Sequence, residues 1–508
     1  MDRNDIKKVQ LNNSSWKTIL IILSCLGLIV MFDETMILPA IPDFIKDFKI
    51  SYSTATWILS AYIIAGAVMT PIAGKLADIY GKKKILLIIM AFYAAGILSG
   101  RFSHNIDLMI ISRIFQGVGL SMFPIAFGII REILPDKKLA MGQTIFGSTF
   151  SGGAVIGIVV GATIIQNFGW QFTFFSIFPV AVALWIIIWR FVHIGNKELP
   201  TDLNNISNNK NNNDHLTKYK KNEERSIIQK MDLKGIFALI ITIVSFLSGI
   251  TIMESKDINV NINLIVLFSI SLFSLAVFIL IEKRSKIPLL DLKLMTSKFF
   301  ISPVIILMLI SMSIFMVYQS IPVMVRSPQP LGFGGDTMDS ASVQVPFMIV
   351  LFIGTILSGF LLNRVGNIRL LLLGTIISTI GFFSLIALHS TENMVTIGLV
   401  IISCGLALSI AGVFNVILVS VPLQVTGIAL GMTMLLNLIG MSVGPSIAGV
   451  FQQMNQGTVP GIQELYPNSN AYNLIFITAM LMSFISVIMA GTISRKKINK
   501  NPTTTYHR

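Results

Sequence analysis

The sequence has few charged residues for its length. Of its 508 residues, 12% are Asp, Glu, Lys or Arg and 54% are hydrophobic, and the mean hydropathy is +0.78. A typical soluble protein carries about twice that share of charge, and soluble cores stop growing at about 250–300 residues. The composition therefore excludes a soluble globular protein and predicts one that lies in a membrane.

Cysteine and histidine are also scarce. The two cysteines, Cys25 and Cys404, lie far apart in apolar runs, which argues against a disulfide framework, a zinc site and an iron–sulfur site. The five histidines are scattered, at His104, His193, His215, His389 and His507. No G-x-x-x-x-G-K-[ST] phosphate loop occurs, which argues against an ATP-driven pump. We expect no metal and no cofactor.

Long apolar runs dominate the sequence instead. Runs of about 20 mainly apolar residues, the length that crosses a bilayer, predict an all-α integral membrane protein with fourteen transmembrane helices. They lie near 17–39, 54–74, 85–102, 107–130, 141–166, 170–192, 234–253, 261–281, 300–325, 341–362, 369–389, 394–419, 425–451 and 472–493. The first run is too long for a signal peptide and lacks a cleavage site, so we interpret it as a membrane span.

The basic residues predict how the helices are oriented. The formal net charge of +14 would suggest a nucleic-acid partner in a soluble protein. With the N-terminus in the cytoplasm, 32 of the 38 Lys and Arg residues fall in inner segments and five in outer ones, and Arg113 lies within a span. Basic residues mark cytoplasmic loops, so we expect both termini to be cytoplasmic and no nucleic acid to be bound.

These spans and loops divide the chain into seven segments. They are a cytoplasmic N-tail (1–16), an N-terminal six-helix half (17–193), an Asn-rich cytoplasmic linker (194–233), an inserted helix pair (234–282), a cytoplasmic connection (283–299), a C-terminal six-helix half (300–493) and a cytoplasmic C-tail (494–508). The low complexity of the linker predicts a disordered tether.

Two loops repeat one pattern. Gly74–Lys84 and Gly359–Arg369 both read G-x-x-x-(polar)-x-x-G-x-x-(basic), and each lies between the second and third spans of its half. The fifth and thirteenth spans also share spaced glycines, namely Gly153, Gly157 and Gly161 in one and Gly440, Gly444 and Gly449 in the other. Matched landmarks at similar spacing predict that the two halves are copies.

These motifs resemble those of the major facilitator superfamily, in its fourteen-span drug/proton antiporter branch. Gly74–Lys84 is similar to the loop signature G-x-L-[AS]-D-x-x-G-[RK]-[RK]-[RK], and Arg113–Gly119 to the fourth-span motif R-x-x-Q-G-x-G. Phe32–Pro42 resembles the first-span motif L-D-x-T-[IV]-V-N-V-A-L-P, and the stretches 282–292 and 318–346 also look like that branch. The resemblance runs from about 17 to 495 and implies two six-helix halves that work by alternating access.

One motif departs from the family. The fifth-span antiporter motif G-x-x-x-G-P-x-x-G-G has Ile158 in place of its proline, while a Gly-Pro pair occurs in the thirteenth span. The family links that proline motif to antiport, so the difference bears on transport direction. Small residues suit close helix packing, the role we expect for Gly153, Gly157, Gly161, Gly444 and Pro445.

Three charged residues lie within predicted spans: Asp33, Glu34 and Arg113. An unpaired charge at the bilayer centre costs at least about 2.5–3.5 kcal/mol, so such residues are functional candidates. Counting residues from the span ends places Asp33 and Arg113 at similar depth. We expect Asp33 or Glu34 to carry a proton, with Arg113 beside it. The resemblance favours Asp33, and a static Asp33–Arg113 brace between helices is the alternative.

The repeated loops are candidates for a conformational gate. Glycines allow a tight turn and close helix approach, and a carboxylate beside them could pair across the halves. The gate candidates are Gly74, Asp78, Gly81, Lys82, Lys83 and Arg364. The alternative for the lysines is that they only set topology.

Three intramembrane amides, Gln116, Asn415 and Asn437, could line a substrate path or only form hydrogen bonds between helices. The sequence thus predicts a monomeric secondary transporter in a prokaryotic plasma membrane, and not an enzyme. We expect it to exchange protons for small lipophilic or cationic compounds. A symporter or uniporter of a nutrient or metabolite is the alternative, and a membrane-embedded enzyme a remote one.

Overall fold

The computed structural model describes residues 13–134, 136–192, 233–252, 258–284, 292–421 and 426–498. In this part of the chain, thirteen helices are long and apolar enough to cross a membrane, and α11 (Leu233–Ile252) adds a shorter apolar stretch. The all-α expectation is confirmed apart from one small hairpin. Most of the predicted linker and parts of both tails lie outside the described residues.

The first half runs from α1 to α8. Its elements are α1 (Asn13–Met36), η1 (Leu38–Ala40), α2 (Ile41–Phe48), α3 (Tyr52–Tyr80), α4 (Lys82–Arg101), α5 (Ile106–Gly117), η2 (Val118–Ser121), α6 (Met122–Ile133), α7 (Asp136–Phe168) and α8 (Gln171–Phe191). The first span does not end near Pro39 as expected, because the chain continues through η1 into α2. Proline is tolerated there since the first turn of a helix needs no N–H donor.

The remainder comprises the inserted pair and the second half. Its elements are α11, α12 (Ile258–Arg284), α13 (Leu292–Thr296), α14 (Lys298–Arg326), α15 (Thr337–Val365), α16 (Asn367–Ala387), α17 (Glu392–Ser420), α18 (Thr426–Met454), β1 (Gln456–Val459), β2 (Ile462–Pro467) and α19 (Ser469–Ile498). The two strands pair antiparallel. An Asp336–Asp339 capping box starts α15, which satisfies two donors at its N-terminus.

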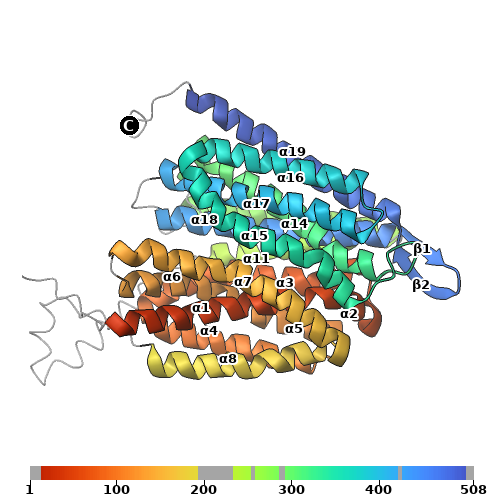
Figure 1. Cartoon of the computed structure of the whole chain (residues 1–508), viewed down its shortest axis with the longest axis horizontal. Coiled ribbons are helices and arrows are strands. Elements are labelled where there is room, and N and C mark those ends of the chain that lie inside the picture. Colours follow the sequence, from red (N-terminus) through yellow and green to blue (C-terminus); the bar gives the residue numbers. More distant parts are fainter. Residues whose placement is uncertain are drawn as a thin grey trace, which may run out of the picture.

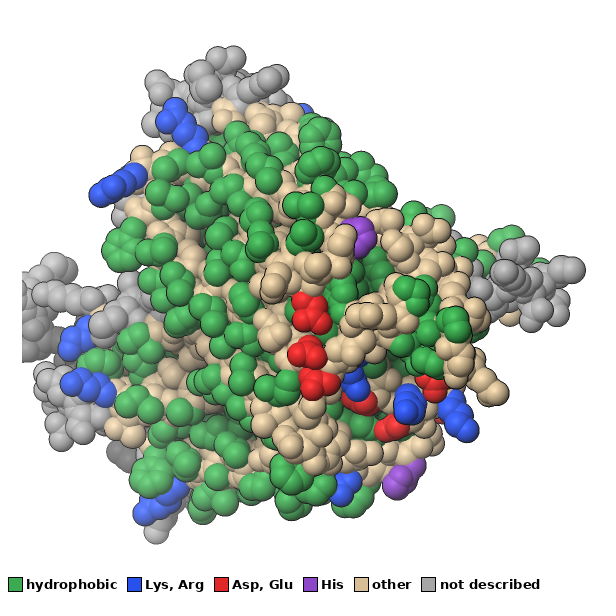
Figure 2. Space-filling view, turned by 45° about the vertical axis from the view of Figure 1, so that its right-hand side comes forward, with side chains coloured by type: hydrophobic (Ala, Val, Ile, Leu, Met, Phe, Trp, Pro, Cys, Tyr) green, Lys and Arg blue, Asp and Glu red, His purple; other side chains and the backbone are tan. Residues whose placement is uncertain are grey.

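The helices form a long bundle in which the two halves lie side by side (Figure 1). The halves meet where α3 packs against α18 and α7 against α15, and α11 of the inserted pair touches both α3 and α18. We call the end with α2, β1 and β2 the hairpin end, and the end where α1 begins and α19 finishes the tail end. Hydrophobic side chains are spread over much of the face in Figure 2, and acidic and basic side chains gather in its right-hand part.

Glycines let corresponding helices approach closely in both halves. A Cβ atom at Gly153, Gly157 or Gly161 of α7 would collide with backbone carbonyl oxygens of α1. In the second half, a Cβ atom at Gly440 or Gly444 of α18 would collide with the carbonyl oxygens of Met308 and Met312 on α14. The α1–α7 contact and the α14–α18 contact therefore both depend on glycines that allow close helix packing.

Candidate functional site

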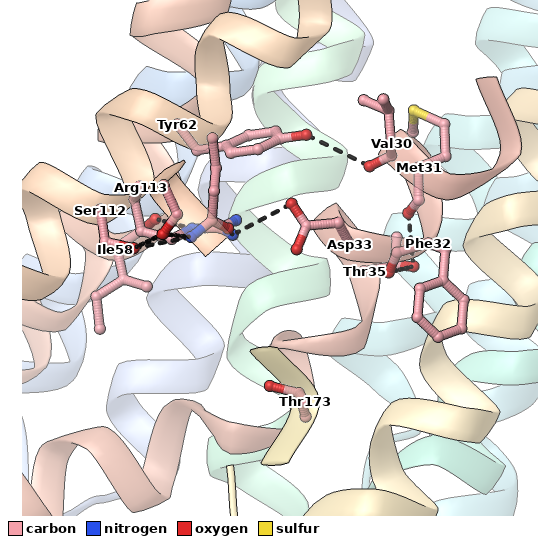
Figure 3. Close-up of polar contacts among 12 residues, drawn as sticks. Val30, Met31, Phe32, Asp33, Thr35, Ile58, Tyr62, Ser112, Arg113 and Thr173 are labelled. Carbon is pink, nitrogen blue, oxygen red and sulfur yellow. Dashed lines mark hydrogen bonds and ion pairs between the residues drawn. The ribbon is translucent and has the colours of Figure 1, made fainter. Parts of the chain in front are cut away.

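A buried pair of opposite charges joins α1 to α5. Asp33 Oδ2 lies 4.0 Å from Arg113 Nη1, and neither side chain is exposed. Figure 3 shows the Asp33 carboxylate pointing from α1 toward the Arg113 guanidinium. The structure thus brings together the two residues whose similar depth the sequence indicated.

Arg113 is held chiefly by groups other than Asp33. Its Nε donates to the carbonyl of Ile58 at 3.1 Å, and its Nη1 donates to Gln116 Oε1 at 2.6 Å. The guanidinium also lies 4.3 Å from the centre of the Tyr62 ring, a cation–π distance. These contacts fix the cation within the first half whether or not Asp33 is charged.

Gln116 has its other contacts inside the same half. Its Nε2 donates to Ser112 Oγ at 2.8 Å and to the Gly96 carbonyl at 3.1 Å. The side chain is fully buried. In this structure Gln116 therefore positions Arg113, the bonding role that the sequence left open for it.

The Asp33 carboxylate is held loosely by comparison. Neither of its oxygens forms a hydrogen bond with any described residue, and Arg113 Nη2 is likewise without an acceptor there. The Tyr93 hydroxyl on α4 lies close enough to Asp33 for a weak hydrogen-bonding interaction, although the two groups do not reach normal hydrogen-bond geometry. A carboxylate with so few bonds can gain a proton without breaking a hydrogen-bond network.

Glu34 shares Arg113 and Tyr62 with Asp33 as electrostatic neighbours and has one further neighbour in the second half. Only 7% of it is exposed, and it lies within electrostatic range of Tyr62 on α3 and of Tyr318 on α14. Tyr318 belongs to the other half, so Glu34 lies near the boundary between the halves, although it also interacts electrostatically with Arg113 on α5. Successive helical residues point about 100° apart, so the two carboxylates point in different directions.

Polar groups that the sequence did not single out surround this boundary. The Tyr318 hydroxyl, Gln319 Oε1 and Gln344 Oε1 are buried without hydrogen-bond partners among the described residues. Gln344 Nε2 donates to the Tyr318 carbonyl at 2.8 Å, which ties α15 to α14. Only their position within the family-like stretch 318–346 gave any signal for them.

An ion pair joins the two halves at the hairpin end. Arg326 of α14 donates from Nη1 and Nη2 to the two carboxylate oxygens of Asp43 on α2, each at 2.7 Å. The same Nη1 donates to the Pro39 carbonyl at 2.9 Å. Bidentate pairing of this kind is specific in geometry as well as in charge. Asp43 and Arg326 lie 283 residues apart, and the sequence analysis did not select them.

Other bonds between the halves cluster at the same end. Gln166 of α7 donates through Nε2 to Asp336 Oδ2 at 2.7 Å and accepts from the Thr337 backbone N–H at 3.2 Å. Hydrogen bonds from the Asp339 backbone N–H and from the Gln166 side chain hold the pKa of Asp336 below its usual value. Tyr52 N–H of α3 donates to Gln453 Oε1 of α18 at 3.0 Å.

At the tail end, the described gate candidates bond within their own half. Lys82 pairs with Glu132 of α6, and Lys83 Nζ donates to the Trp189 carbonyl of α8 at 2.7 Å. Arg364 is exposed on α15. The structure therefore does not bring Lys82 or Lys83 against the second half. The side chain of Asp78 lies outside the described ones.

The glycines of the repeated loops differ in what they do. Gly81 and Gly366 occupy equivalent turns at φ +94° and φ +86°, where a side chain would be strained. Gly74 is helical, with open space beside it. The turn role is thus visible at Gly81 and its counterpart, and the structure shows no close approach at Gly74.

The two remaining amides bond to neighbouring groups. Asn437 Oδ1 accepts from Ser311 Oγ at 2.5 Å, joining α18 to α14. Asn415 Nδ2 donates to the Ala411 carbonyl at 2.9 Å, one turn earlier on α17. Within the described residues, no three His, Cys, Asp or Glu side chains come together as a metal site would require.

The fold and these motifs can now be set beside known proteins. A sequence model of the Major Facilitator Superfamily matches residues 23–445. The chain belongs to the major facilitator superfamily. The matched segment runs from α1 to α18, so it includes membrane-spanning helices of both halves.

Two similar relatives come from Bacillus subtilis (strain 168). The multidrug transporter protein MdtP is 25% identical over 380 residues, which cover 74% of this chain and 64% of MdtP. Multidrug resistance protein 3 is 24% identical over 356 residues, which cover 70% of this chain and 63% of that protein. The chain thus matches slightly less than two thirds of the length of these relatives.

Solved structures share the fold at low identity. A bacterial homologue of the human lysosomal transporter Spinster, inward-facing and occupied, gives a TM-score of 0.68 at 13% identity, covering 97% of this chain and 100% of that one. A D-xylose–proton symporter gives 0.62 at 12% identity, covering 94% and 97%. These similarities show that the chain shares the fold of these proteins.

Proposed function

We propose that this superfamily transporter exports small lipophilic or cationic compounds in exchange for protons. The observation that carries the proposal is the buried Asp33 carboxylate, which faces an anchored Arg113 at 4.0 Å and forms no hydrogen bond with any described residue. A charge buried in a membrane protein is expensive unless it has a function. The printed names of the two bacterial relatives support the choice of substrate class.

Proton loading follows from the geometry around Asp33. The ionised carboxylate is attracted to Arg113, whereas the protonated acid is not, so protonation weakens the hold of α5 on α1. Arg113 keeps its bonds to Gln116 and Ile58 in either case. Because α1 also packs on α7 through glycines, a change at Asp33 is transmitted to α7, which contacts α15 in the second half.

In this proposal the substrate binds at the boundary between the two halves, beside Asp33. Glu34 is within electrostatic range of Tyr62 and Tyr318 there, so its ionised form supplies a negative charge near two aromatic residues. Such a combination suits a lipophilic cation. In this scheme Asp33 carries the proton and Glu34 attracts the cationic substrate. The proton and the substrate can then be bound in turn.

The bonds between the two halves support a conformation that is closed at the hairpin end. Bonds between the halves gather at the hairpin end, at Asp43–Arg326 and Gln166–Asp336. With both termini in the cytoplasm of a prokaryotic cell, as the basic residues predict, this end faces outward and the tail end faces the cytoplasm. Each chain contains the complete buried cluster, which supports transport by a monomer.

A second candidate is a proton symporter or a uniporter of a nutrient or metabolite. Ile158 stands where the antiporter motif has proline, and the fold is shared with a D-xylose–proton symporter. Symport would use the same Asp33 proton site with the opposite substrate direction. Uniport would not require it.

Accumulation of ethidium, a fluorescent lipophilic cation, distinguishes these functions. Cells that produce the protein should accumulate less ethidium than cells without it, and a protonophore should abolish the difference. Cells with Asp33→Asn at equal abundance should resemble cells without the protein. Equal ethidium levels with and without the wild-type protein would overturn the proposal for this substrate class.

A further inference from the structure

The inserted pair α11 and α12 is antiparallel in a register fixed by two hydrogen bonds. Ser274 Oγ donates to the Ala238 carbonyl at 2.7 Å, and Ser271 Oγ donates to the Thr242 carbonyl at 3.0 Å. Extending this register one turn places Lys234, near the start of α11, opposite about residue 278 of α12. The first residues of α11 and the last residues of α12 therefore lie at the same end of the pair.

An open groove of about 690 Å³ runs along this pair. It is lined by Lys234, Phe237, Ala238, Ile241, Ser269, Ile270, Phe273, Ser274 and Val277. The lining is almost wholly apolar because the Ser274 hydroxyl is bonded to the α11 backbone. Phe237 and Phe273 stand out from the surface, 66% and 72% exposed, and border the groove.

The groove follows the axes of α11 and α12. Its residues span eight positions of α11 and nine of α12, or roughly 10–12 Å along the helix axes. That length is about a third of the hydrocarbon thickness of a bilayer. In a membrane transporter this face meets lipid, so the natural occupant is part of an acyl chain.

Positive charge is concentrated at one end of the groove. Lys234 forms part of the lining, and Lys283 and Arg284 are exposed at the end of α12. By the register above, Lys283 lies about five residues beyond the level of Lys234, or roughly 7 Å. Glu282 is buried, so the exposed charges of the described pair at this end are basic.

We propose that this groove binds an anionic phospholipid, with one acyl chain along α11 and α12 and the headgroup phosphate at Lys234. Lipid tails are as apolar as the groove, so filling it discriminates little between lipids. Selectivity must come from the headgroup, at about a fivefold gain in affinity for each basic residue near it. Because α11 packs on both α3 and α18, a bound lipid supports the pair where it bridges the two halves.

Native mass spectrometry of the full-length protein in mild detergent tests the site. The protein is titrated with phosphatidylglycerol or with phosphatidylcholine of identical chains. We expect one phosphatidylglycerol to bind more tightly than phosphatidylcholine, and Lys234→Gln to weaken phosphatidylglycerol about fivefold and phosphatidylcholine, whose choline offsets the phosphate charge, by less. Lys298→Gln is the matched control, since Lys298 is an exposed lysine on α14 outside the groove lining.

A second variant tests the groove itself. Ile270→Trp adds bulk to an exposed lining position (41% exposed) without changing charge, and should weaken both lipids. Equal affinity for the two lipids in the wild type, or equal effects of Lys234→Gln and Lys298→Gln, would overturn the proposal. So would a wild-type dimer that Ile270→Trp separates with lipid binding unchanged, because the face would then bind a second copy of the chain.

Discussion

Arg113 and Asp33 face each other across α5 and α1 with 4.0 Å between Nη1 and Oδ2, and both side chains are completely buried. The two residues are held unequally. Arg113 has Ile58, Gln116 and the ring of Tyr62 as further partners, whereas Asp33 lacks hydrogen bonds to any described group. We therefore propose that Arg113 is the fixed member of the pair and that Asp33 is the one that changes state.

This asymmetry predicts unequal stability effects. Arg113→Gln leaves the Asp33 charge buried without a cation and removes the donor to the Ile58 carbonyl, so it should destabilise the protein by about 3–5 kcal/mol. Asp33→Asn leaves the bonds of Arg113 intact and should lower the unfolding temperature less. Thermal unfolding in detergent measures both, with the exposed Arg364→Gln as control. A larger effect of Asp33→Asn than of Arg113→Gln would contradict this view.

The Asp43–Arg326 pair should bias the transporter toward the state closed at the hairpin end. Both side chains are partly exposed, 26% and 19%, so the pair contributes at most about 1 kcal/mol, or fivefold in population. Arg326→Gln should therefore increase the population open at that end. The distance between spin labels on Lys46→Cys and Gln329→Cys measures this population, in a background where Cys25 and Cys404 are replaced by serine.

Exchanging the two charges provides the control for that measurement. Asp43→Arg combined with Arg326→Asp should return the spin–spin distance distribution toward that of the wild type, because the pair is re-formed in reverse. An unchanged distribution in Arg326→Gln would show that the ion pair does not hold this end closed.

Two adjacent glycines of α7 should respond in opposite directions to alanine. Gly152 has open space beside it, so Gly152→Ala should stabilise the helix by up to about 1 kcal/mol. A Cβ atom at Gly153 would collide with the Leu28 carbonyl oxygen of α1, so Gly153→Ala should destabilise by about 1–3 kcal/mol. Unfolding temperatures of both variants test the α1–α7 contact, and equal shifts would exclude close packing there.

Asp336 should add an acid-sensitive contribution to stability. The Asp339 N–H and the Gln166 side chain lower the pKa of Asp336 in the folded state. The contribution is therefore complete above the unfolded pKa of about 3.9 and is lost as the pH falls through the folded value. Asp336→Asn should be slightly less stable than wild type at pH 7, with the difference shrinking below about pH 4. Unfolding temperatures are measured across this pH range, with Asp107→Asn as a charge control. A difference between Asp336→Asn and wild type that does not change with pH would contradict the prediction.

The helices were predictable because the length of an apolar run is a local property. The sequence also indicated that Asp33 and Arg113 share a depth, since helical rise converts residue counts into distance. It did not reveal that the first span continues to Phe48, because a proline usually reads as a helix end.

Tertiary contacts were the unpredictable part of the site. Tyr62, Tyr93 and Tyr318 looked like ordinary members of apolar runs, since a tyrosine has the same local pattern whether it faces lipid or a buried carboxylate. Asp43 and Arg326 are joined only by the packing of α2 against α14. Gln116 was recognised as a candidate, but its bond to Arg113 depends on the direction of both side chains.

Proton movement driven by substrate in proteoliposomes tests the central claim most directly. An ethidium gradient is imposed across the membrane and the internal pH is followed with a trapped dye. The account predicts counter-movement of protons with the wild-type protein, none with Asp33→Asn, and retained coupling with weaker ethidium dependence in Glu34→Gln. Wild-type proton movement in folded Asp33→Asn would contradict the assignment of Asp33 as the proton carrier.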